Sequence, residues 1–166
     1  MFNVNDKVIH PGMGVCTITD IKYENFGKLG TKKFYVLSPF YGNCKTVIFV
    51  PTDSTKIVLK KLLSEEEIVT LLNEIDFSRS IWVDNDVLRK EAFFRILKSG
   101  DRKELILMLK ELHERRIEKE SKGKRLHIND EKLLQEAEKI IHEELAFSMN
   151  ISIEKVGDYI VQHINK

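Results

Sequence analysis

The residues best able to do chemistry are spread along the chain rather than gathered in motifs. The histidines lie on separate predicted elements, without a carboxylate spaced as in a general base, so we expect them to be exposed or to cap helices: His10, His113, His127, His142 and His163. The carboxylate runs 65–67 and 143–144 are typical of a helix start and of a solvated helix face. No glycine-rich phosphate loop, nucleophile elbow or zinc-protease motif is present. We therefore expect neither an enzymatic activity nor a small-molecule substrate.

The cysteines do not form a recognisable metal site. Cys16 and Cys44 lack a C-x-x-C partner and have no histidine at the spacing of zinc ligands. A site built from these two residues and His10 is chemically possible, but the spacing favours two small buried side chains. We expect no metal, no cofactor and no disulfide.

Trp82 is the only tryptophan, and it stands among polar residues just before a basic, amphipathic stretch. One interpretation is an ordinary core aromatic, which is favoured because tryptophan is usually well buried. The other is an exposed wedge that stacks on a DNA base step while Arg89, Lys90 and Arg95 hold phosphates. The position of the indole decides between the two.

The charge distribution limits where a nucleic acid could bind. The formal net charge is only +1, although charged residues make up 32% of the chain. Basic residues exceed acidic ones over residues 1–60, whereas acidic residues prevail over 61–166. Within the second part, residues 79–103 and 110–125 lean basic. A nucleic-acid site is therefore expected as a local face rather than as the whole surface.

The chain shows no sign of membrane targeting. No apolar run approaches the ~20 residues that cross a bilayer. The first residues lack the basic and apolar regions of a signal peptide. Hydrophobic residues make up 42% of the chain, which is typical of a globular protein. We expect a cytoplasmic protein that makes no membrane contact.

Residues 1–60 have the pattern of a small β domain. Short β-branched and aromatic runs at 8–10, 15–19, 34–37 and 46–50 are separated by turns such as Pro11-Gly12-Met13-Gly14. Pro51 stops the last run. Such closely spaced strands predict a small antiparallel barrel of the SH3-like or Tudor-like kind. These barrels often bind partners through an exposed strand edge.

After residue 60 the hydrophobic period becomes helical, which predicts an all-α domain over residues 61–166 and an α+β fold overall. The second predicted helix covers residues 89–98. The helices are expected to begin or end at these residues: Ser64 with Glu67, Gly100, Asp101, Asn129 or Asp130, and Ser152.

Four segments, taken in order, resemble one family. They are Phe2-x-Val4-x-Asp6-x-Val8-x-x-Pro11-x-x-Gly14, residues 46–51, residues 96–101 with the helix after them, and Asp130-Glu131-Lys132. This series resembles the CarD/CdnL transcription regulators. The first domain of these proteins also occurs as the RNA-polymerase-interacting domain of the bacterial transcription-repair coupling factor. The resemblance covers nearly the whole chain.

The resemblance implies a non-enzymatic transcription regulator. Its barrel would bind the β subunit of RNA polymerase, and its helical domain would contact promoter DNA, without sequence specificity, at the upstream edge of the melted bubble. A tryptophan wedge would stabilise the open complex there. The protein would be associated with the nucleoid through the polymerase.

The resemblance also places the candidate site residues. For DNA, Arg89 and Lys132 fall on family positions, Lys90 and Lys98 are added from local charge, and Trp82 lies four residues before the family's tryptophan position at Asp86. For the polymerase, the candidates are Lys22, Glu24, Lys33, Val47, Phe49 and Pro51. Two arginines of the family fall near Glu24 and Phe49, so docking here is expected to rely on strand pairing and on apolar and lysine side chains.

An alternative hypothesis keeps the fold but changes the partner of the helical domain. Residues 131–144 are acidic, and the tryptophan is offset from the family position. The protein would then be a polymerase-bound adaptor that recruits another protein rather than DNA.

Overall fold

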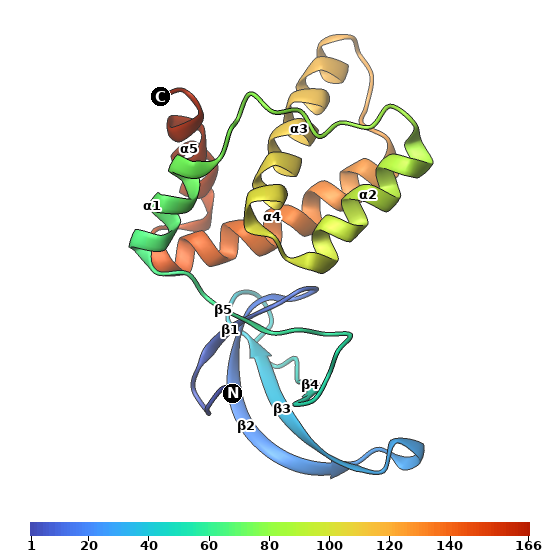
Figure 1. Ribbon diagram of the computed structural model, residues 1–166, viewed down its shortest axis with the longest axis vertical. Coiled ribbons are helices and arrows are strands. Elements are labelled where there is room, and N and C mark those ends of the chain that lie inside the picture. The colour runs from blue at the N-terminus through green and yellow to red at the C-terminus, as the bar shows by residue number, and fades with distance from the viewer. The chain divides into compact units, whose positions relative to one another are not determined.

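The computed structural model describes residues 1–166, and the chain divides into two compact units. The first unit is Met1–Leu62 and the second is Leu63–Lys166. Five strands form the first unit and five α-helices form the second (Figure 1). The overall class is therefore α+β, with the strands and the helices segregated along the chain.

The first unit is one antiparallel sheet with the strand order β4-β3-β2-β1-β5. Its strands are β1 (Lys7–His10), β2 (Gly14–Asn25), β3 (Thr31–Pro39), β4 (Ile48–Pro51) and β5 (Lys60–Lys61). The short 3-10 helix η1 (Gly27–Leu29) joins β2 to β3, and these two strands form a long, curved hairpin (Figure 1). β4 and β5 are the two edges of the sheet.

Turn chemistry and one bulge shape this sheet. Gly14 has φ 74 at the start of β2, a conformation that glycine adopts without steric cost, so β1 can turn tightly into β2. The register of β2 against β3 shifts between Ile18 and Asp20. Because of this bulge, Ile18 and Ile21 both contribute to the same core although they are three residues apart.

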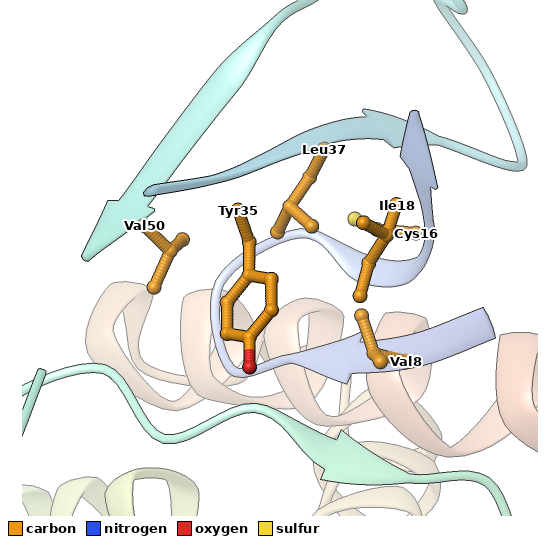
Figure 2. Packing of buried hydrophobic residues seen from close by; sticks show 6 residues of the cluster. All are labelled: Val8, Cys16, Ile18, Tyr35, Leu37 and Val50. Atoms are coloured by element: carbon orange, nitrogen blue, oxygen red, sulfur yellow. The ribbon is translucent and has the colours of Figure 1, made fainter. Parts of the chain in front are cut away.

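The core of the sheet unit is small and lies on one face of the strands. Its buried members come from β1, β2, β3 and β4 and point toward one another (Figure 2): Val8, Cys16, Ile18, Tyr35, Leu37 and Val50. Alternate residues of β3 therefore serve opposite faces, since Tyr35 and Leu37 enter this core while Phe34 and Val36 lie on the other side.

The predicted barrel is not closed. No strand pairing joins β4 to β5, so the sheet remains open between its two edges. The physical reason is the brevity of β5, which has two residues and pairs only with β1. A cavity of about 400 Å³ lies near the open side, lined in part by the segment before β5.

The second unit is a helical bundle that contains α1 (Glu65–Glu74), α2 (Asp86–Ser99), α3 (Arg102–Ser121), α4 (Ile128–Met149) and α5 (Ile153–Ile164). α4 crosses the unit and packs against each of the other four helices (Figure 1). Its inward positions are Leu133, Leu134, Ala137, Ile140, Ile141 and Leu145, all of which are buried. None of the helices is long and apolar enough to span a membrane.

Most of the predicted helix ends are confirmed. Ser64 and Glu67 form a capping box at α1, Gly100 ends α2 in the left-handed region with φ 63, and the Asp101 side chain caps α3. α2 begins earlier than predicted, because the side chain of Asn85 accepts a hydrogen bond from the Leu88 N–H. Ser152 occupies the N-cap position of α5 but makes no side-chain capping bond.

Three expectations about polar residues need correction. His127, rather than Asn129 or Asp130, caps α4, and His10 is buried in the sheet unit instead of exposed. Glu144 is fully buried rather than solvated, and Glu143 is also buried. The Glu144 carboxylate accepts hydrogen bonds from the Leu63 N–H at 3.0 Å and from the Arg102 guanidinium at 2.8 Å, so it fixes the start of the unit to the bundle.

Candidate protein-docking edge and nucleic-acid interface

The outer edge of β4 has no partner strand within the chain. The Thr52 N–H donates to the Lys33 carbonyl at 3.0 Å, which makes this pair a hydrogen-bonded one. Since hydrogen-bonded and non-hydrogen-bonded pairs alternate in antiparallel strands, Phe49 lies opposite Val36 in a non-hydrogen-bonded pair. The N–H and C=O of Phe49 therefore point outward, where a further strand can pair with them.

This open edge is short and has a defined end. Pro51 has no N–H to offer, and its carbonyl accepts a hydrogen bond from the Ser54 N–H at 3.0 Å. At the other end, Val47 precedes the strand, with 58% of its surface exposed. A partner strand can therefore pair only along a short stretch, which is centred on Phe49 and bounded by Val47 and Pro51.

An aromatic cluster lies on the face of the sheet opposite the core. The rings of Phe26, Phe34 and Phe49 meet edge to face, with centroids 5.0 to 6.2 Å apart. Phe34 is buried beneath the other two, while Phe26 remains 45% exposed. The cluster therefore forms a partly exposed apolar surface beside the β4 edge.

Two charged candidates border this cluster. The Lys22 ammonium lies 2.9 Å from the Glu24 carboxylate and 5.5 Å from the Phe49 ring centroid. The hydrogen bond and charge of Glu24 raise the pKa of Lys22, so the ammonium is stabilised as a cation. Glu24 thus presents its carboxylate to Lys22 and partly cancels its charge.

Lys33 is separated from the other docking candidates. Along β3 it shares a side with Tyr35 and Leu37, and its ammonium lies 6.0 Å from the ring centroid of Tyr23. Lys22, Phe49 and the aromatic cluster lie on the opposite face. The structure therefore gathers five of the six docking candidates around the β4 edge and its aromatic face, and places Lys33 on the core face.

Trp82 lies in the segment between α1 and α2, and it is half-buried. Two guanidinium carbons lie over its ring, that of Arg89 at 4.4 Å and that of Arg115 at 4.5 Å from the centroid. Phe93 of α2 meets it edge to face at 6.3 Å. The indole is thus neither fully buried in the core nor a free wedge, but is held by cation–π and aromatic contacts.

The segment that carries Trp82 is fixed by a buried carboxylate. Glu111 of α3 is 4% exposed and accepts hydrogen bonds from the Ser80 hydroxyl and, at 3.1 Å, from the Ile81 N–H. On the other side of the tryptophan, the carbonyls of Val83 and Asp84 accept from Arg89. These bonds hold the backbone on both sides of the indole.

Arg89 is a structural residue rather than an available phosphate ligand. It is 3% exposed, and every N–H of its guanidinium donates within the unit: to Asp130 and Asp86, and to the two backbone carbonyls. The hydrogen bonds that Arg89 donates to Asp130 and Asp86 raise its pKa against the opposing effect of burial. The expectation that Arg89 holds a DNA phosphate is therefore corrected, because it has no donor left for one.

The other predicted DNA residues are exposed. Lys90, Lys98 and Lys132 all reach solvent, and the Lys98 ammonium lies 4.8 Å from the ring of Phe94. The groups that contact the indole come instead from Arg89, Phe93 and Arg115. Sequence reasoning missed Arg115 and Glu111. The basic stretch 110–125 was its only signal, and it does not say which residue faces the tryptophan.

The cysteines and histidines do not gather into a metal site. Cys16 is buried in the sheet core, whereas Cys44 is exposed. No group of three or more histidine, cysteine, aspartate or glutamate side chains is placed to hold a metal ion.

Comparison with known proteins identifies the first unit. Residues 2–63 match the family model described as the CarD-like/TRCF RID domain, and the chain is consistent with a CarD-like family. No curated protein matches the chain. A domain of this kind indicates interaction with RNA polymerase and a role in the regulation of transcription.

Proposed function

We propose that this chain uses its CarD-like/TRCF RID domain to dock on the β subunit of RNA polymerase, and its helical unit to stabilise the promoter open complex. The helical unit contacts DNA without sequence specificity at the upstream edge of the bubble. The observation that carries the proposal is the match of residues 2–63 to a polymerase-interacting family, together with an unpaired strand edge in that same unit.

The β4 edge supplies the docking geometry. A strand of the β subunit pairs with the outward N–H and C=O of Phe49, and the pairing ends where Pro51 offers no donor. Exposed apolar area at Val47 and Phe26 adds contact beside the new pair. Two arginine positions of the family fall near Glu24 and Phe49 in this chain. Backbone pairing does not depend on those arginines, so docking can proceed without them.

Trp82 supplies the DNA contact. Its half-buried indole keeps part of its surface in solvent, and its backbone is held on both sides by Glu111 and Arg89. A base step costs a few kcal/mol to unstack, and contact with the exposed part of the indole offsets some of this cost, because the guanidinium groups of Arg89 and Arg115 already lie over the ring. A preorganised indole on DNA that is already distorted thus gives a modest net stabilisation.

Docking makes a weak DNA contact sufficient. Once the first unit is bound to the polymerase, the helical unit meets promoter DNA as an intramolecular partner, at an effective concentration in the mM range for a short connection. Exposed lysines such as Lys90, Lys98 and Lys132 add phosphate attraction that is independent of sequence. A net charge of only +1 is compatible with this arrangement.

The docking half is tested by retention of the full chain on immobilised polymerase β subunit. Val47→Asp puts a carboxylate beside the β4 edge and is expected to lower retention at least tenfold, which is about 1.4 kcal/mol of binding free energy. Val4→Asp is the matched control, because Val4 is also exposed in the first unit but stands before β1. Equal retention of the two variants would reject the β4 edge as the docking site.

The adaptor hypothesis has one observation in its favour. α2 exposes three apolar side chains, with Val87 at 66%, Leu88 at 55% and Phe94 at 48%. Such a surface suits a protein partner as well as DNA. Retention of the chain on DNA that falls steeply with salt, and that falls less steeply in Lys132→Gln, would count against the adaptor.

A further inference from the structure

The two guanidinium groups on Trp82 differ in how many of their N–H groups are already used within the unit. Arg89 is 3% exposed, and all of its N–H groups are used within the unit. Arg115 keeps 37% of its side chain exposed, and its one ion pair is a loose contact of 3.6 Å with Glu118. Arg115 therefore lies over the indole with donors that face solvent.

The surroundings of Arg115 favour an anion. Lys119 follows it by one helical turn on α3 and lies on the same face. Lys119 and His127 both help to lower the pKa of Asp86, after the larger effect of Arg89, so both side chains lie close to the segment that carries Trp82. Lys119 also falls within the last turns of α3, where a cation is favourably placed.

Three carboxylates near this group already have partners. Asp86 is 2.7 Å from Arg89, and Glu111 accepts from Ser80 and Ile81. Glu118 is shared between Arg115 at 3.6 Å and Lys122 at 3.2 Å. An incoming phosphate at Arg115 thus replaces one weak, exposed ion pair, which contributes little to stability.

We propose that Arg115, with Lys119, binds the DNA phosphate next to the base step that Trp82 contacts. This assignment rests on the proposed DNA contact and replaces Arg89 as the phosphate ligand at the tryptophan. The Arg115 guanidinium carbon lies 4.5 Å from the centroid of the indole ring, so a phosphate that binds the guanidinium lies beside Trp82. Lys90, Lys98 and Lys132 then act as outlying charges rather than as partners of Trp82.

The test measures the salt dependence of DNA binding by the full chain. The probe is a labelled duplex with a short premelted region, followed by fluorescence anisotropy between 50 and 200 mM salt. The emission of Trp82, the only tryptophan, is recorded in the same titrations. Each phosphate contact contributes a slope of about −0.9 in log K against log salt, which is roughly a 3.5-fold loss of affinity over this range.

Four variants separate the possible roles of Arg115. Arg115→Gln is expected to reduce the slope by about one contact and to change the response of Trp82 emission to DNA. Arg115→Lys keeps the cation and is expected to keep the slope. Lys155→Gln removes one exposed positive charge from α5, away from the tryptophan, and is the matched control. Lys119→Gln is expected to reduce the slope while leaving the Trp82 emission of the free protein unchanged. This variant keeps the proposal testable if Arg115→Gln folds poorly.

The outcomes distinguish this assignment from the function on which it rests. If the wild-type chain binds the probe with a change in Trp82 emission, but Arg115→Gln and Lys119→Gln keep the wild-type slope, the phosphate assignment is wrong and the DNA contact stands. If the wild-type chain neither binds the probe nor changes its emission, the DNA contact itself is wrong and the assignment falls with it.

Discussion

The β4 edge and the Trp82 segment differ in whether their backbone N–H and C=O groups have partners within the chain. At the edge, the N–H and C=O of Phe49 face outward with no strand beside them. Around Trp82, the Ile81 N–H donates to Glu111, and the carbonyls of Val83 and Asp84 accept from Arg89, so the backbone is bonded on both sides of the indole. The first surface is completed only by a partner, whereas the second is already complete and offers a rigid side chain.

The two surfaces should therefore respond differently to amino-acid substitutions. Substitutions at the edge remove binding groups that the fold does not use, so they should change docking and leave stability intact. Substitutions around Trp82 remove internal partners of buried charges, so they should change stability first.

The largest effect is expected from Asp130→Ala. Arg89 and Asp130 are 2.7 Å apart, with only 4% and 3% of their side chains exposed, so the variant leaves a buried guanidinium without its main counter-ion. Loss of one partner of a buried pair costs about 3–5 kcal/mol in unfolding free energy. Urea unfolding of the helical signal measures it. Asp86→Ala removes the other partner of Arg89, which is 65% exposed, and should leave the midpoint close to wild type. Equal losses in the two variants would contradict the buried role of Asp130.

A smaller loss is expected from Glu111→Ala. This change leaves the Ser80 hydroxyl and the Ile81 N–H without their acceptor and should cost about 1–3 kcal/mol of unfolding free energy. It should also shift Trp82 emission toward longer wavelengths, because the freed segment exposes the indole to water. Glu114→Ala, at a carboxylate on the same helix that is 58% exposed, is the control. An unchanged emission spectrum in Glu111→Ala would show that Glu111 does not position the tryptophan.

The helical unit should also lose stability in mild acid. Burial lowers the pKa of His142 below its ordinary value, with a smaller lowering from His113 and an opposing effect of Glu138. The unfolded chain therefore takes up the proton first, and the free energy of unfolding falls as pH drops through about 6.5, the ordinary histidine pKa. The pKa of Glu138 is lowered by His113, so its own effect is confined to more acidic pH. Urea unfolding at pH 7.5 and 5.5 should show the loss, and His142→Asn should reduce it. A loss that is identical in His142→Asn would assign it to other groups.

The smallest effect on stability is expected at the β4 edge. Val47 is 58% exposed and lies outside the strand, so Val47→Asp should change the free energy of unfolding by no more than about 0.5 kcal/mol. The same variant should lose most of its binding to the polymerase β subunit. A thermal melt of the purified chain provides the check. A large drop in the melting midpoint would mean that the edge also supports the fold.

Local signals account for the features that could be predicted from the sequence. The capping box at Ser64 and the pair Gly100 and Asp101 depend on neighbours within a few residues, and the structure has them where the pattern indicates. The strand that contains Phe49 also followed from its β-branched run and its terminating proline.

Features that depend on distant partners could not be predicted. Arg89 looks like an exposed helix cation in the sequence, but its main counter-ion is 41 residues away. Glu144 looks like part of a solvated face, yet it binds Leu63 and Arg102 from far along the chain. Closure of the barrel depends on a pairing between β4 and β5 that the short β5 does not make.

In the proposed function, one chain links RNA polymerase, through the β4 edge, to promoter DNA, through Trp82. The lifetime of a polymerase–promoter open complex after addition of a competitor tests it most directly. The wild-type chain is expected to lengthen this lifetime, while Val47→Asp and Trp82→Ala should each lose most of the effect, the first through docking and the second through the DNA contact. A lifetime that both variants lengthen as much as the wild type would contradict the account.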